Sequence, residues 1–132
     1  MKKDRLAGIV YAVVSVGVIA FQIALALGAP WGEYAMGGAY SGQFPPELRV
    51  AAIVQAVILA GLALVVLARA GIALPTWSRM SRWLVWVVVA FSALSLVLNI
   101  ITPSAGERVI WAPVALIMLV SSVTVAVSKH PQ

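Results

Sequence analysis

Four uninterrupted apolar stretches constrain this chain more than any other feature of its sequence. They cover residues 6–29, 50–68, 83–101 and 109–128, and no charged residue lies within any of them. A helix needs about 20 residues, rising 1.5 Å each, to cross the hydrocarbon core of a bilayer. The sequence therefore predicts an all-α integral membrane protein, a four-helix bundle of up-down topology in which residues 1–132 form a single membrane domain.

The composition supports a lipid environment. Apolar residues make up 63% of the chain and charged residues 10%, whereas soluble domains have roughly 45–50% and 25%. Residues 6–29 follow a basic N-terminus as a signal peptide would, but the stretch is longer than the ~7–15 residues of a signal-peptide core. We expect it to be a retained helix, with the lipid bilayer as the main partner of the chain.

The distribution of charges predicts the orientation. Short cytoplasmic connections of membrane proteins are enriched in Lys and Arg. One side of the predicted bundle holds most of the basic residues: Lys2, Lys3, Arg5, Arg69, Arg79, Arg82 and Lys129. The other side holds Arg49 and Arg108 with the acids Glu33, Glu47 and Glu107. We therefore expect a multi-pass membrane protein with both termini cytoplasmic, and we interpret the net charge of +5 as topology rather than nucleic-acid binding.

Missing side chains exclude several chemistries. The chain has no cysteine, and its single histidine, His130, lies near the C-terminus. Disulfides, thiolate ligands, cysteine nucleophiles, bis-histidine haem and histidine metal sites are therefore excluded within one chain. We predict no catalytic residue, no metal site and no cofactor.

The connections differ in character. Residues 30–49 form a long external loop, rich in glycine, proline and aromatic residues, which we expect to fold back onto the membrane surface. The connection containing Arg69, Arg79 and Arg82 resembles a cytoplasmic turn anchored to anionic headgroups. Residues 102–108 are too few for anything but a tight turn, so the third and fourth helices should be antiparallel neighbours.

Small residues recur at intervals of four in the first two stretches. They are Gly8, Ala12, Ala20, Ala24 and Gly28, interrupted at Val16, then Ala52, Ala56, Ala60 and Ala68, interrupted at Leu64. Such stripes let helices approach closely in lipid, so the two helices should pack together, and the stripes could also assemble a homo-oligomer. The alternative is that alanine is simply common in this chain.

Polar side chains within the apolar stretches gather near the external side. Gln22, Gln55 and Asn99 lie about 10, 9 and 3 Å below that boundary at 1.5 Å per residue. Ser92, Ser95 and Asn99 share one helical face, which should point into the bundle. Pro113 lies near the start of the fourth helix and either kinks it or occupies its first turn.

The external loops add charges and aromatic rings to these amides. Together they form a candidate ligand-binding site, composed of Gln22, Trp31, Glu33, Tyr34, Arg49, Gln55, Asn99, Glu107, Arg108 and Trp111. Embedded polar groups often mark substrate or ion sites. The alternative is that the amides bond between helices and the charged pairs hold the loops.

Two motifs carry a resemblance. The first is Gly28-x-Pro30-Trp31-Gly32-Glu33 followed by Gly37-Gly38, and the second is Glu107-Arg108-x-Ile110-Trp111-x-Pro113-Val114. With these motifs the chain resembles a family of small uncharacterised four-span bacterial integral membrane proteins. The resemblance implies a four-helix fold in the bacterial inner membrane and no particular activity. The turn that commonly reads Ser-x-Ser in that family is Thr102-Pro103-Ser104 here.

These observations support three functional hypotheses. The first is that the external cleft binds a small amphipathic or lipidic ligand, with Glu33 or Glu107 as the charged contact. The second is a structural or interaction subunit that assembles with itself or with another membrane protein and has no ligand of its own. The third, which is less favoured because no nucleophile or metal set accompanies the acids, is an intramembrane enzyme using Glu33 and Glu107 as acid and base. Proton-coupled export of the small drug-exporter kind is disfavoured, because the first apolar stretch offers only Gln22 where such exporters carry a carboxylate.

Overall fold

The protein is a bundle of four long helices. The computed structural model describes residues 2–35, 38–39 and 42–128, so Gly37, Tyr40, Lys129 and His130 lie outside the described residues. The four helices are α1 (Lys2–Ala26), α2 (Pro46–Arg69), α3 (Ser78–Ile101) and α4 (Ala105–Ala126). The described residues also include the short 3₁₀ turns η1 (Gly32–Tyr34) and η3 (Pro75–Trp77). Each of the four is long and apolar enough to cross a membrane. The predicted all-α fold is confirmed.

The helices extend into the charged flanks of the apolar stretches. α2 begins at Pro46, with proline at its start and Glu47 in its first turn, so residues 46–49 belong to the helix rather than to the loop. α1 ends three residues before its apolar stretch does. Gly28 adopts a positive φ of 102°, and the amides of Gly28 and Ala29 donate to the carbonyls of Leu25 and Ala24. This bonding pattern closes a helix at a left-handed glycine, and Gly71 ends α2 in the same way.

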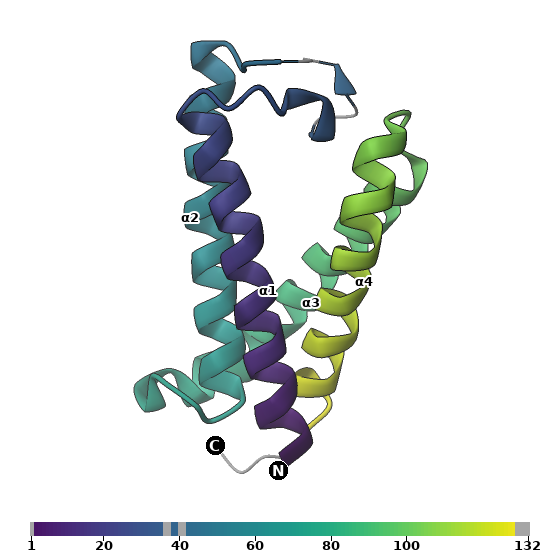
Figure 1. Cartoon of the computed structure of the whole chain (residues 1–132). Coiled ribbons are helices and arrows are strands. Elements are labelled where there is room, and N and C mark those ends of the chain that lie inside the picture. The colour runs from purple at the N-terminus through teal and green to yellow at the C-terminus, as the bar shows by residue number, and fades with distance from the viewer. Residues whose placement is uncertain (1, 36–37, 40–41, 129–132) are drawn as a thin grey trace.

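Consecutive helices run antiparallel and form two hairpins, α1–α2 and α3–α4 (Figure 1). One end of the bundle carries the α1–α2 loop and the short α3–α4 turn, and we call it the loop end. The other carries the start of α1, the end of α4 and the α2–α3 connection, and we call it the terminal end. The two hairpins spread apart toward the loop end (Figure 1). The expected pairing of the first helix with the second, and of the third with the fourth, is confirmed.

The packed core occupies the terminal half of the bundle. Tyr11, Val66, Val85, Val88 and Val125 are completely buried and belong to one cluster that joins all four helices. A smaller cluster near the loop end involves α1, α2 and their loop. The two hairpins are therefore held together chiefly at one end.

The small-residue stripes mainly pack against other parts of the same chain. Gly8, Ala52, Ala56 and Ala68 are buried, and a Cβ on Gly8 would lie only 2.9 Å from the Cβ of Ala70. Ala20 and Ala60 are exposed. Assembly into a homo-oligomer stays a prediction, and these exposed members are the ones left to support it.

Two side chains differ from their predicted settings. Arg69 was expected to reach headgroups, but it is 7% exposed and its Nη2 donates to the Ser128 carbonyl at 3.0 Å, connecting the end of α2 with the end of α4. The headgroup interpretation is therefore wrong for Arg69, although Arg79 and Arg82 are exposed.

Pro113 lies well inside α4, so the alternative that it occupies the first turn is also wrong. Because proline has no backbone N–H, the Val109 carbonyl does not receive the helical hydrogen bond that it would otherwise accept from residue 113.

Candidate functional site

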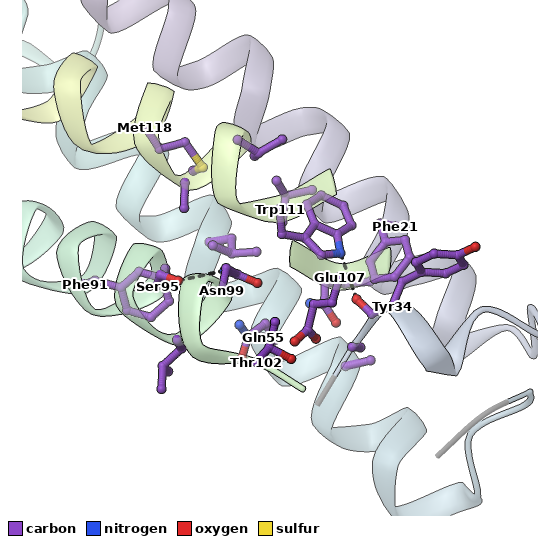
Figure 2. A pocket seen from close by; sticks show the side chains of 18 of the residues that line it. Phe21, Tyr34, Gln55, Phe91, Ser95, Asn99, Thr102, Glu107, Trp111 and Met118 are labelled. Carbon is purple, nitrogen blue, oxygen red and sulfur yellow. Dashed lines mark hydrogen bonds between the residues drawn. The ribbon is translucent and has the colours of Figure 1, made fainter. Parts of the chain in front are cut away.

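A cavity of about 650 Å³ lies between the two hairpins in the loop half of the bundle. This volume is within the range of small-molecule sites, roughly 300–1,000 Å³. Its walls are mostly apolar and aromatic, with Phe21, Phe91, Trp111 and Met118 among the lining side chains (Figure 2). The cavity exists because the packed core is confined to the terminal half.

Polar side chains concentrate toward the loop end of this cavity. Gln55 of α2, Asn99 of α3 and Glu107 of α4 all line it, and Figure 2 shows them away from Phe91 and Met118. Asn99 donates from Nδ2 to the Ser95 carbonyl at 2.7 Å, which fixes the orientation of the amide. Glu107 is only 7% exposed. Its position in the first turn of α4 places the carboxylate at the positive end of the helix dipole.

The α1–α2 loop is bound to the start of α4. Trp111 donates from Nε1 to the Tyr34 carbonyl at 2.8 Å, and the Ser104 hydroxyl donates to the Glu33 carbonyl at 2.8 Å. The Tyr34 ring covers Gly106 so closely that a Cβ there would lie 2.6 Å from its Cε1. The loop was expected to fold back onto the membrane surface. Its described residues pack against the start of α4 and contribute to the lining of the cavity, while the contact with the membrane surface stays a prediction.

Aromatic contacts close the side of the cavity between α1 and α4. Phe21 of α1 meets Trp111 of α4 edge to face, with ring centroids 4.7 Å apart. Trp31 stacks on Phe21 at 6.3 Å but does not line the cavity. Such pairs pack closely and exclude other molecules between them.

The opposite side of the cavity, between α2 and α3, is open. The exposed lining residues on the helices all belong to these two: Ala51, Gln55, Leu98 and Ile101. Lining residues from α1 and α4 are buried or half-buried. In a bilayer, the gap between α2 and α3 would face lipid.

The two arginines of the predicted site hold backbone rather than lining the cavity. Arg49 donates from Nε to the Phe44 carbonyl at 2.8 Å, and Arg108 donates from Nη2 to the Thr102 carbonyl at 2.6 Å. Phe44 and Thr102 are buried lining residues. The arginines therefore position the rim of the cavity.

The structure brings together six of the ten predicted site residues and leaves four outside. The cavity lining includes Gln22, Tyr34, Gln55, Asn99, Glu107 and Trp111. Those outside are Trp31, Glu33, Arg49 and Arg108, of which Glu33 is exposed. The predicted inward face of Ser92, Ser95 and Asn99 is confirmed, since all three line the cavity.

The sequence interpretation missed the apolar walls and the inner end of the cavity. Val18, Leu59, Phe91 and Met118 line its deepest part, and nothing in an apolar stretch marks such residues as different from lipid-facing ones. Ser92 was placed on the inward face but was not included in the site.

Among residues 2–35, 38–39 and 42–128, no group of three His, Cys, Asp or Glu side chains is arranged to hold a metal ion. Comparisons with protein-family models, curated proteins and solved structures found no match to this chain. The cavity and its chemistry are therefore the observations from which function has to be argued.

Proposed function

We propose that the protein binds a small amphipathic or lipidic molecule in the cavity between its hairpins. The observation that carries this proposal is the distribution of polarity in a 650 Å³ space, which has apolar walls and a polar group of residues at one end. An apolar portion of the ligand would lie against Phe91 and Met118, and its head group would lie near Gln55, Asn99 and Glu107. A carboxylate among these groups favours a cationic or hydrogen-bond-donating head group.

The opening between α2 and α3 supports a ligand that comes from the membrane. The exposed lining residues Leu98 and Ile101 would contact acyl chains, so a molecule dissolved in one leaflet could enter without crossing the loop. The charge distribution supports an orientation with the loop end outside the cell. The family resemblance supports a bacterial inner membrane.

The two motifs behind the family resemblance also support a shared role around this cavity. Trp111 of the second motif donates a hydrogen bond to the carbonyl of Tyr34, the residue directly after the first motif. We expect the motifs to act together, one forming a wall of the cavity and the other positioning the loop that borders it.

The proposal is tested by filling the opening. In Ala51→Trp the indole would occupy the gap between α2 and α3, because Ala51 is an exposed lining residue. Ala60→Trp is the matched control, since Ala60 is exposed on the same helix but does not line the cavity. Binding of isotope-labelled decylamine is measured by equilibrium dialysis against nanodiscs that contain the protein, with empty nanodiscs subtracted.

We expect wild type and Ala60→Trp to bind decylamine equally well. Ala51→Trp should lower the affinity about tenfold or more, which corresponds to about 1.4 kcal/mol. Equal affinity in all three proteins, or no binding above that of empty nanodiscs, would contradict the proposal.

A further inference from the structure

The inner end of the cavity contains a hydroxyl group in an otherwise apolar setting. The deepest lining residues are Val18 of α1, Leu59 of α2, Phe91 and Ser92 of α3, and Met118 of α4. Ser92 is 3% exposed, and its Oγ has no hydrogen-bond partner among the described residues. It is the one polar side chain in this set, at the point where the cavity ends.

Two more buried hydroxyls lie on α1 next to this end. Tyr11 is completely buried and Ser15 is 1% exposed, and neither has a hydrogen-bond partner within the described part of the chain. The Tyr11 hydroxyl lies close to Ser92, but the two do not reach hydrogen-bonding geometry. Tyr11, Ser15 and the lining residue Val18 are spaced so that they share one face of α1.

Unpartnered hydroxyls in this setting are unusual. Buried polar groups in proteins are nearly always hydrogen-bonded, because leaving one unpaired in an apolar environment costs free energy. The cost is avoided when a bound molecule supplies the missing donor or acceptor. Ser92 is the member of this group that belongs to the cavity lining. A rotation of its side chain about the Cα–Cβ bond would turn the buried hydroxyl toward a ligand in the cavity.

We propose that Ser92, with Tyr11 behind it, forms a second polar subsite that binds a hydroxyl or carbonyl group of the ligand. This inference rests on the proposed function and narrows its ligand class to amphipathic molecules with polar groups at both ends. Asn99 and Ser92 lie seven residues apart on α3, about 10 Å along the helix axis. The ligand therefore has a head group at the loop end, an apolar middle, and a second polar group roughly this distance deeper.

The test compares two probes that differ by one hydroxyl. Octylamine and 8-hydroxyoctylamine have the same amine and chain, and only the second carries a polar group at its far end. The eight-carbon chain is close in length to the separation of Asn99 and Ser92 along α3. Their affinities are measured in nanodiscs for wild type, Ser92→Ala and Tyr11→Phe. For each protein we take the ratio of the two affinities, and we then compare these ratios between proteins. The two probes partition differently into lipid, but this difference is the same for every protein and therefore cancels.

Ser121→Ala is the matched control. Ser121 is also a buried serine, 6% exposed, but it lies on α4 beyond the end of the cavity and does not line it. We expect the preference for the hydroxylated probe to fall about 2- to 13-fold in Ser92→Ala, the range that follows from losing one net hydrogen bond. Tyr11→Phe should lower it in the same direction, and Ser121→Ala should leave it at the wild-type value.

The outcomes separate the two proposals. If both amines bind but the affinity ratio is the same in wild type and Ser92→Ala, the subsite is refuted while the binding cavity stands. A fall of equal size in Ser121→Ala would also overturn the subsite, because the effect would then be structural. If neither amine binds wild type above empty nanodiscs, the proposed function fails and the subsite fails with it.

Discussion

The loop that borders the cavity is attached to α4 by two hydrogen bonds, and removing one of them should make it open more often. In Trp111→Phe an aromatic ring still packs against Phe21, but the bond from Nε1 to the Tyr34 carbonyl is lost. A neutral hydrogen bond contributes about 0.5–1.5 kcal/mol net. With RT of about 0.59 kcal/mol, the population of the open loop should therefore rise about 2- to 13-fold.

This opening can be measured because the chain has no cysteine of its own. Ala35→Cys places a thiol at a half-buried position that lines the cavity, so a membrane-impermeant maleimide should label it mainly when the loop opens. Ala39→Cys is the control site, since Ala39 is exposed in the closed loop. Labelling at Ala35→Cys should accelerate 2- to 13-fold when Trp111→Phe is added.

The same substitution should leave the labelling of Ala39→Cys unchanged. Trp86→Phe serves as the matched indole control, because Trp86 is an exposed residue of α3 away from the cavity. An unchanged rate at Ala35→Cys would refute the role of the Trp111 bond in closing the loop. An equal acceleration at both cysteines would refute it too, because the loop would then be loosened as a whole.

Two further substitutions test other contacts. Gly106→Ala would place a Cβ 2.6 Å from the Tyr34 ring, so it should displace the loop and accelerate the labelling of Ala35→Cys more than Trp111→Phe does. It should also destabilise the fold by about 1–3 kcal/mol in thermal unfolding. Unchanged labelling would contradict this, because the Tyr34 ring would then move aside without displacing the loop. Arg69→Met removes a charged hydrogen bond to the Ser128 carbonyl and should cost about 1.5–3 kcal/mol in SDS-induced unfolding, whereas Arg79→Met, at an exposed position, should stay within about 0.5 kcal/mol. Equal effects of the two arginine substitutions would contradict the buried role of Arg69.

Much of the fold follows from simple properties of the sequence. The length and hydropathy of the four stretches decide the helices, and the short turn near Pro103 decides that α3 and α4 are neighbours. The inward face of α3 could be predicted because Ser92, Ser95 and Asn99 are polar residues at helical spacing within an apolar stretch. Polar residues are informative there because lipid penalises them.

The parts that could not be predicted depend on contacts between distant segments. Arg69 resembled the exposed arginines near it, and only the approach of the end of α4 gives its guanidinium a buried acceptor. Glu33 and Glu107 looked equivalent as charged contacts, yet Glu33 is exposed while Glu107 lines the cavity. The apolar walls gave no signal at all, since Phe91 or Met118 would be equally acceptable facing lipid.

The separation between a packed terminal half and an open loop half has a consequence for how such a chain can evolve. Assembly of helices in a membrane depends on close packing between them, and here the hairpins meet chiefly through residues such as Val66, Val85 and Val88. Substitutions at Gln55, Phe91 or Asn99 would reshape the cavity and leave this core cluster intact, because none of the three residues belongs to it. The shape and polarity of the cavity can therefore change during evolution while the contacts that hold the two hairpins together are kept.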